Sequence, residues 1–365
     1  MIARTGAAAL ACLLTAALGS AATLEEASLT GAGKVRGGVL AHAAGARPVA
    51  MGEAFTAVAD DASAMGWNPG GLGQLKEASG IAAYDMAGLD TSMSYAAIAV
   101  PFGRSSAVGV SLMALTYGDY DVRDVNGMKT GTEASPSDMA ASISFSVANP
   151  GKMGWSGISV EGASESIGGT LMGLSIGSVV PVNGTTSVGW VAQHIGIGHS
   201  LPTTMKIGGV CAVPIGGQAL SVALDVAYSM TRQQWISAGV EYVPHSMVAV
   251  RVGYKRYLQD QGITGVTGVT GGLGVRFAGF GLDYAYQPFG DLTTSHRISI
   301  VFGMPRGETQ AQEGPAPARK AEPVARKAEP VRRAEPAARK AESVSKAEPA
   351  SKEEPAGNPE PTSEK

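Results

Sequence analysis

Seven charged residues stand out because they fall on one face of segments that are otherwise apolar or small. They are Asp225, Glu241, Arg251, Lys255, Arg276, Asp283 and Arg297. Opposite charges that face each other on neighbouring strands attract. Counted outward from the intervening turns, Glu241 is predicted to face Arg251, and Asp283 is predicted to face both Arg297 and Arg276. The pattern allows two interpretations: a ladder of ion pairs that neutralises buried charge, or a patch that contacts a ligand.

No residues have the spacing of a catalytic or metal site. The histidines are far apart along the chain, and two of them, His194 and His296, fall on predicted strand positions that face lipid. An outward His would need a nearby Ser and Asn to form a membrane-embedded hydrolase site. The glycine-rich run 265–274 lies in a predicted strand, which is the wrong context for a phosphate-binding loop. We therefore expect no enzyme activity, no cofactor and no metal.

The elements that must position these charges are predicted strands. Bulky apolar residues alternate with Gly, Ala, Ser or a charge, which is the period of a strand. In 220–228, for example, Leu220, Val222 and Leu224 fall on one face and Asp225 on the other. Turn signals such as Asn183-Gly184 separate fourteen segments, namely 79–88, 92–103, 105–117, 136–148, 153–165, 169–182, 184–198, 201–214, 217–230, 233–244, 246–258, 266–277, 279–288 and 293–304.

The sequence predicts an all-β fold, a transmembrane antiparallel barrel of about 14 strands. Its apolar face would contact outer-membrane lipid, and its small residues would suit a crowded lumen. Short turns alternate with longer links, and the two longest, 118–135 and 259–265, fall on the same side. This asymmetry is typical of short periplasmic turns and long extracellular loops.

Composition and the N-terminus agree with a protein that leaves the cytoplasm. The chain has 365 residues, 50 Gly, only 16% charged residues and a net charge of −3, which argues against nucleic-acid binding. Residues 1–22 have the basic start, short apolar run and small-residue cleavage sites of a secretory signal peptide. A short membrane anchor and a lipoprotein modified at Cys12 are weaker alternatives.

Residues 23–78 differ from the predicted strands. Val49 to Ala64 lacks strict alternation and is predicted to form a short helix beginning near Pro48. This segment could hang in the periplasm or fill the lumen, since side chains alone cannot fill a barrel of this size. Six residues form its candidate hatch motif: Arg47, Met51, Asp60, Asp61, Asn68 and Pro69. Of these, Arg47, Asp60, Asp61 and Asn68 are expected inside the barrel or at its periplasmic mouth, near lumen charges such as Glu241, Arg251 and Asp283.

One long motif in this segment carries a family resemblance. Residues 45–64, GARPVAMGEAFTAVADDASA, are followed at 67–72 by WNPGGL. Together they resemble the N-terminal signature of the PorV/PorQ family, which belongs to the wider FadL-like outer-membrane barrels. Gly70 departs from the usual Ala. Residues 239–242, 251–254 and 282–286 resemble the family as well.

The resemblance covers about residues 40–304 and implies a fourteen-stranded outer-membrane barrel with an N-terminal hatch at 23–78. It also implies transport of hydrophobic small molecules through the plugged barrel. An alternative is an accessory of type IX protein secretion that receives secreted cargo proteins at the outer membrane.

The last part of the chain, 305–365, is a charged repeat. From 307 onward it carries 11 Lys and Arg, 11 Asp and Glu, and no aromatic residue. It has nothing to bury and is predicted to be disordered. Because an even number of strands returns the chain to the side it started from, we expect the tail in the periplasm. It would be a passive tail or a tether to the cell wall or a periplasmic partner, and in the latter case the protein could be a structural anchor.

Overall fold

The structure is a computed structural model, and it describes residues 37–88, 90–103, 106–166, 169–197, 201–215, 218–230, 233–259 and 262–303. The chain divides into two compact units, 1–317 and 318–365, and every described residue belongs to the first. The predicted signal peptide at 1–22 and the predicted tail beyond Gly303 lie outside the described residues.

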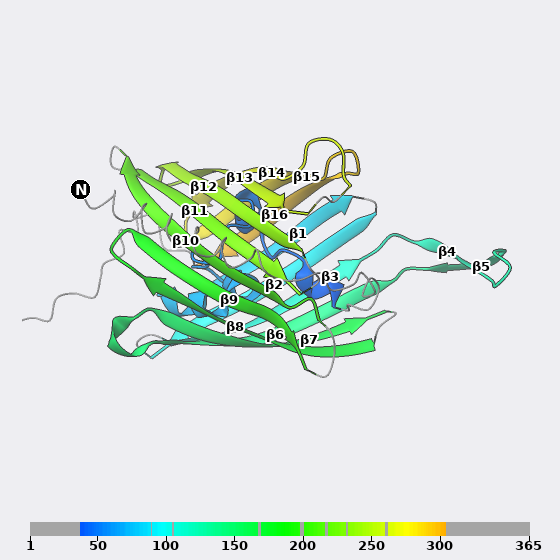
Figure 1. The fold of residues 1–365 in the computed structure, drawn as a ribbon, viewed down its shortest axis with the longest axis horizontal. Helices are drawn as coiled ribbons and strands as arrows, with labels where there is room; N and C mark the ends of the chain where they lie inside the picture. Colours follow the sequence, from blue (N-terminus) through cyan, green and yellow to red (C-terminus); the bar gives the residue numbers. More distant parts are fainter. Residues whose placement is uncertain are drawn as a thin grey trace, which may run out of the picture. The chain divides into compact units, whose positions relative to one another are not determined.

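Fourteen antiparallel strands close into a barrel, which confirms the predicted fold class (Figure 1). Each strand pairs with the next barrel strand along the chain, and β1 pairs with β16 to complete the ring. The strands are β1 (Ser79–Gly88), β2 (Thr91–Phe102), β3 (Ser106–Thr116), β6 (Ser137–Ala148), β7 (Trp155–Glu165), β8 (Gly169–Pro181), β9 (Thr186–Gly196), β10 (Thr204–Ile215), β11 (Gln218–Ser229), β12 (Gln234–His245), β13 (Val248–Tyr257), β14 (Val269–Phe277), β15 (Phe280–Pro288) and β16 (Thr294–Phe302).

The two ends of the barrel differ in the length of their links. At one end the links include 117–136 and 258–268, and we call it the long-loop end. At the other, links such as 246–247 and 278–279 join strands directly, and we call it the short-turn end. β1 begins and β16 ends at the short-turn end.

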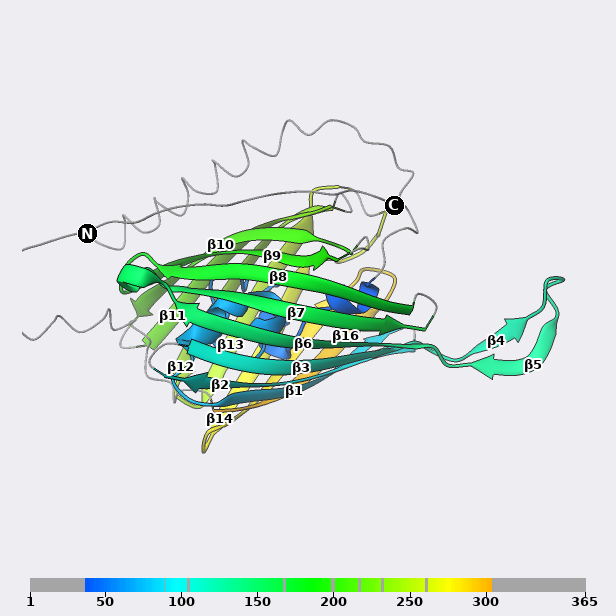
Figure 2. The same cartoon turned by 90° about the horizontal axis from the view of Figure 1, so that it is seen from below.

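A hairpin lies within the longest link, where the sequence indicated only a loop. β4 (Tyr120–Arg123) and β5 (Lys129–Ala134) form a two-stranded sheet that extends beyond the ends of β3 and β6 (Figure 2). Its turn is closed by Asp124, whose Oδ1 accepts from the amides of Asn126 and Met128, each at 2.9 Å. The hairpin is exposed on both faces, so it lacks the alternation that identifies a half-buried strand.

The barrel wall has an apolar outside and a small or polar inside. Leu112, Ile143 and Val252 are 64%, 62% and 56% exposed on the outer face. Their neighbours along the strands, such as Ser111 and Ser142, are buried and face inward. The alternation is therefore reversed relative to a soluble domain, because the bulky apolar side chains point outward and the small or polar side chains point inward. None of the described helices is long and apolar enough to cross a membrane.

We call residues 37–78 the inner segment; most of it lies inside the barrel (Figure 1), and its last three residues, 76–78, are exposed just before β1. The segment forms η2 (Gly38–Ala41), α2 (Ala46–Ala50), α3 (Ala64–Trp67) and η3 (Pro69–Gln74). α2 packs on β13 to β16, and η3 packs on β6 to β8. The amide of Gly37 donates to Glu165 at the long-loop end, so the segment runs from that end to β1 at the short-turn end.

The predicted helix over 49–64 is wrong. α2 ends at Ala50, and the chain turns at Gly52 and Glu53, which have φ values of 64° and 65°. Tertiary contacts replace helical hydrogen bonds here: the amides of Phe55 and Thr56 both donate to Asp225 on β11. Local propensity is overridden by the wall of the barrel.

Candidate functional site: the interface between barrel and inner segment

Arg47 on α2 binds three carboxylates. Its Nε and Nη2 donate to Glu241 of β12 at 2.9 and 3.0 Å. Its Nη1 donates to Asp60 at 2.5 Å and to Asp61 at 3.3 Å, both in the inner segment. Burial alone would lower the pKa of Arg47, but the carboxylates of Asp60 and Glu241 outweigh it and hold that pKa well above its ordinary value. Arg47 therefore stays charged and ties the inner segment to the wall.

The ion pairs continue along the wall from Glu241. Arg251 Nε lies 2.5 Å from Glu241 Oε2, and Arg251 Nη1 lies 2.7 Å from Asp283 Oδ1. Arg276 Nη2 lies 2.9 Å from the Asp283 carboxylate. We call this set the charge network, and its members are Arg47, Asp60, Asp61, Glu241, Arg251, Asp283 and Arg276. It leads from the inner segment toward the short-turn end, where β14 ends.

The predicted facing of Asp283 and Arg297 is wrong. Asp283 faces Ser299, whereas Arg297 lies between Ala285 on β15 and Asp85 on β1. Arg297 forms its ion pair with Asp85 and also donates to the carbonyl oxygen of Ala43. The prediction took Gly290 as the centre of the turn, whereas the strand pairing is centred on Asp291. Moving the centre by one residue moves the partner of Asp283 by two, from Arg297 to Ser299. Asp85 was missed, although it has the inward parity of its strand.

Asn68 and Pro69 fix the inner segment against the opposite wall. The Asn68 amide nitrogen donates to Ser178 O at 3.1 Å, Trp190 O at 3.3 Å and Thr56 O at 2.8 Å, while its oxygen accepts from the Gly70 amide. The Pro69 backbone lies against Gly157 of β7, where any side chain would collide with it. Asn68 is fully buried, so its hydrogen bonds compensate for its lost hydration.

Wall glycines allow the inner segment to approach the strands closely. A Cβ atom at Gly239 would lie 2.5 Å from the carbonyl oxygen of Met51, which is itself fully buried. A Cβ at Gly189 would lie 2.5 Å from the carbonyl oxygen of Thr56. At these two positions, glycine permits direct contact between the wall and the backbone of the inner segment.

A second cluster lies nearer the long-loop end. Lys255 Nζ lies 2.6 Å from Glu53 Oε2 and 5.0 Å from the ring centres of Trp235 and Tyr257. Lys206 Nζ lies 4.8 Å from the ring centre of Trp67 and 5.9 Å from that of Trp235. We call it the lysine–aromatic cluster, and its members are Glu53, Trp67, Lys206, Trp235, Lys255 and Tyr257. Of these the sequence singled out only Lys255; Lys206 has the inward parity that could have identified it.

The other charged residue of the prediction, Asp225, accepts two backbone hydrogen bonds of the inner segment. Its Oδ2 lies 2.9 Å from the amide nitrogens of both Phe55 and Thr56. Asp225 lies in the same row of the wall as Lys255, because it pairs with Ser237, which in turn pairs with Lys255. The structure divides the seven predicted charges. Glu241, Arg251, Arg276 and Asp283 belong to the charge network and Lys255 belongs to the lysine–aromatic cluster, whereas Asp225 and Arg297 each contact the inner segment separately.

The prediction that His194 faces lipid is wrong. His194 has a φ of 55°, and the pairing of β8 with β9 shifts register beside it, so this bulge turns its side chain inward. Its Nδ1 lies 2.7 Å from Glu161, which also accepts from Ser175 at 2.5 Å. The hydroxyl of Ser175 is bonded to Glu161 and not to the imidazole, so these residues do not form a nucleophilic triad. His296 does lie on the outer face, where its Nδ1 is 2.8 Å from Tyr284 Oη.

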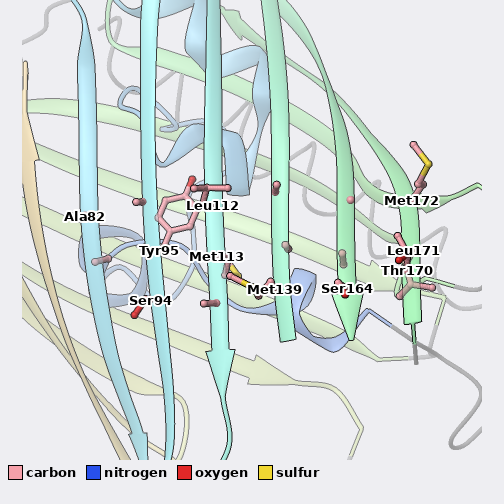
Figure 3. A pocket seen from close by; sticks show the side chains of 17 residues that line it. Ala82, Ser94, Tyr95, Leu112, Met113, Met139, Ser164, Thr170, Leu171 and Met172 are labelled. Carbon is pink, nitrogen blue, oxygen red and sulfur yellow. The ribbon is translucent and has the colours of Figure 1, made fainter. Parts of the chain in front are cut away.

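A hollow of about 740 Å³ lies on the outer face of β1, β2, β3, β6, β7 and β8 (Figure 3). It forms where small outward residues such as Ala82, Ala96 and Ala141 are flanked by Leu112 and Met139. Within the described residues, no group of three or more His, Cys, Asp or Glu is placed to hold a metal.

No protein-family model matches the chain, and no curated protein matches it. The barrel is similar to the P. putida toluene transporter TodX, at 11% identity and a TM-score of 0.46 over 66% of this chain and 92% of that chain. It is similar to the Ralstonia pickettii toluene transporter TbuX, at 15% identity and a TM-score of 0.43 over 70% and 96%. The KdgM porin follows at 8% and 0.34 over 62% and 99%. Values this low say nothing about which molecules this chain handles.

Proposed function

We propose that the chain is an outer-membrane barrel that transports hydrophobic small molecules, with the inner segment as its hatch. The outer face supports the membrane part of this proposal. Large apolar side chains are exposed all around the barrel. Their contact with water would be unfavourable, whereas contact with lipid would be favourable. Aromatic residues lie toward both ends of the outer face, with Phe277 and Phe280 at the short-turn end and Tyr286 toward the long-loop end, as in the interfacial girdles of membrane barrels.

The observation that carries the transport proposal is the way the lumen is closed. The inner segment contacts the wall through charged side chains, backbone amides and glycines, as well as through an apolar core around Phe55 and Leu72. Among the residues that the structure describes, no disulfide joins it to the wall, and Cys211 is free. Polar contacts of this kind can be exchanged for water or ligand contacts, so a passage can open by movement of the segment.

Two measurements test this function in cells that lack the native copy. Cells that produce the wild-type protein should take up an apolar probe such as toluene faster than cells without it, while vancomycin should enter neither. The variant Arg47→Met should admit vancomycin because it loosens the hatch. Arg123→Gln, which changes an exposed arginine of the β4–β5 hairpin, is the matched control. Equal toluene uptake with and without the protein would contradict the proposal.

A second candidate function is favoured by the motif at 45–64 and 67–72, which resembles the PorV/PorQ family. If the chain is related to that family, the barrel would receive cargo proteins of type IX secretion at the outer membrane. Deleting the gene should then leave cargo proteins in the periplasm, whereas under the transport proposal secretion should be unchanged and toluene uptake should fall.

The tail is proposed to lie in the periplasm, where it could bind the cell wall or a partner. β16 ends at the short-turn end, and in this proposal that end faces the periplasm. Protease added to intact cells should leave residues 307–365 uncut, and the same protease should remove them once the outer membrane is permeabilised. Cleavage in intact cells would contradict the proposed orientation.

A further inference from the structure

Arg256 is a charged side chain on the outer surface of the barrel. Of the Asp, Glu, Lys and Arg residues on the described barrel strands, it alone is exposed, and the others are buried or half-buried. It continues the outward series of Val252 and Tyr254 along β13, whereas Arg251 is buried. No carboxylate among the described residues lies within ion-pair distance of its guanidinium, so the described part of the chain leaves this charge unpaired.

Arg256 lies at the height where a membrane barrel meets the lipid headgroups. It is the next-to-last residue of β13, at the long-loop end, and it lies two residues beyond the outward-facing Tyr254. Outward tyrosines mark the boundary between the apolar part of a bilayer and its surface. A charge that is costly at the middle of the bilayer is tolerated near this boundary. In the proposed orientation the long-loop end faces the exterior, so Arg256 is at the surface of the outer leaflet.

A notch lies in the outer face of β14 at Gly271. Its neighbour Gly272 faces the lumen, because a Cβ atom there would lie 2.5 Å from the Cβ of Ala50, so Gly271 faces outward. Apart from its chain neighbours, the one atom within 4 Å of a Cβ at Gly271 would be the carbonyl oxygen of Arg251, at 3.9 Å. No side chain from an adjacent strand therefore fills this position.

Tyr286 borders the notch without covering it. Strand pairing places Gly271 between Val252 of β13 and Tyr286 of β15. The ring of Tyr286 lies 5.4 Å from the ring of His296 on β16, which is on the far side from Gly271. His296 is itself held by Tyr284, whose Oη lies 2.8 Å from its Nδ1. The notch is thus open to an apolar chain that lies along the wall.

We propose that Arg256 and the Gly271 notch bind one phosphorylated glycolipid of the outer leaflet. The phosphate accepts paired hydrogen bonds from the guanidinium, and an acyl chain lies in the notch. Val252, which borders the notch, precedes Arg256 by four residues, roughly 13 Å along the strand, so one lipid can reach both. Charge complementarity selects the occupant, because an unpaired cation at the membrane surface attracts an anionic headgroup. This inference goes beyond transport and uses only the proposed placement in the membrane.

The experiment uses the full chain purified in detergent, and native mass spectrometry measures the lipid that stays bound. The probes are lipid A, dephosphorylated lipid A and inorganic phosphate. The wild type should bind lipid A roughly tenfold or more tightly than the dephosphorylated form, as expected for hydrogen bonds between charged groups. Excess inorganic phosphate should not displace lipid A, because it has no chain to occupy the notch.

Two substitutions test the two parts of the site. Arg256→Met should weaken lipid A binding by roughly tenfold or more, and Arg256→Lys should weaken it less, because it keeps the charge but loses the paired hydrogen bonds. Arg123→Met on the exposed β4–β5 hairpin is the control for loss of an arginine. Gly271→Leu should weaken lipid A binding by filling the notch. Its control is Gly162→Leu on β7, where the nearest atom to a Cβ is 4.0 Å away.

Equal binding of lipid A and its dephosphorylated form, or unchanged lipid A binding by Arg256→Met, would overturn the proposal. Displacement of lipid A by inorganic phosphate would also overturn it, because the site would then recognise phosphate without a lipid. If Gly271→Leu fails to assemble, the probe comparison and Arg256→Met still decide. Loss of lipid A selectivity with normal toluene uptake removes only the lipid site, and absent toluene uptake with selective lipid A binding removes only transport.

Discussion

Arg47 of the inner segment holds Glu241 of the barrel wall through two parallel hydrogen bonds, from Nε at 2.9 Å and from Nη2 at 3.0 Å. The two residues are 194 positions apart in the chain, so the pair joins parts that no local element connects. Bidentate pairing gives this contact both strength and a fixed geometry. Glu241 also binds Arg251, so removing Arg47 leaves Glu241 with a partner while Asp60 and Asp61 lose theirs.

The first prediction concerns that pair. Arg47→Met should destabilise the closed position of the inner segment by about 3–5 kcal/mol, because it removes the ion-pair partner of Asp60 and Asp61 inside the barrel. Limited proteolysis of the purified barrel should then cut within 37–78, and the barrel itself should remain intact. Lys76→Met, at the exposed end of the inner segment, is the control. An uncut inner segment in the Arg47 variant would mean that the charge network does not hold it.

The second prediction concerns the outer face. Val250→Arg should impair assembly, because a charge facing lipid near the middle of the membrane costs about 2–4 kcal/mol. Val250→Leu at the same position should assemble normally. Heat-modifiable mobility in gels distinguishes folded from unfolded barrels. Normal assembly of the arginine variant would show that this face does not contact lipid.

The third prediction tests the close approach between wall and inner segment. Gly239→Ala should destabilise the protein by about 1–3 kcal/mol, because its Cβ would overlap the Met51 carbonyl oxygen. Gly162→Ala is the matched control, since the nearest atom to a Cβ there is 4.0 Å away. Thermal unfolding of both variants provides the comparison. Equal melting temperatures would contradict the packing described for residues 51–52.

The fourth prediction is a pH dependence. Burial would raise the pKa of Glu53, but Lys255 and Lys206 lower it below its ordinary value. A group with a depressed folded-state pKa stabilises the folded state above its unfolded value, about 4.3, and that contribution is lost as pH falls through the folded value. Glu53→Gln should therefore be less stable than the wild type at pH 7, and the difference between their free energies of unfolding should become smaller below about pH 4.

The wild type and the Glu53→Gln variant are compared at each pH because both contain Asp60. Burial raises the pKa of Asp60, so its effect on stability changes with pH in the opposite direction, and this effect cancels in the difference between the two proteins. Unfolding in urea across pH 3–7 measures the difference. A gap that stays constant over this range would show that the Glu53 carboxylate does not stabilise the closed segment.

The strands could be predicted because each carries its own signal. The alternation of apolar and inward residues, such as Val250 and Arg251, can be recognised within a single strand. Short turns then determine which strands are neighbours for most of the barrel. The partner of Arg297 could not be predicted for two reasons. The pairing of β15 with β16 depends on the exact centre of their turn, and Asp85, which binds Arg297, lies more than 200 positions away in the chain. The bulge at His194 and the turn at Glu53 arise from contacts across the lumen, which no local pattern encodes.

If the inner segment must move for a molecule to pass, a reversible disulfide between it and the wall should stop transport. Ser299 Oγ lies 2.7 Å from the Ala46 amide nitrogen, so the side chain of residue 299 touches the backbone of residue 46, and Ala46→Cys with Ser299→Cys in a Cys211→Ser background is the pair to cross-link. The control pair, Ser144→Cys with Ser159→Cys, bridges neighbouring wall strands, where the hydroxyl oxygens are 2.8 Å apart. Toluene uptake should stop when the first pair is oxidised and return on reduction, while the control pair should have no effect. Unchanged uptake through the oxidised Ala46–Ser299 lock would contradict the account.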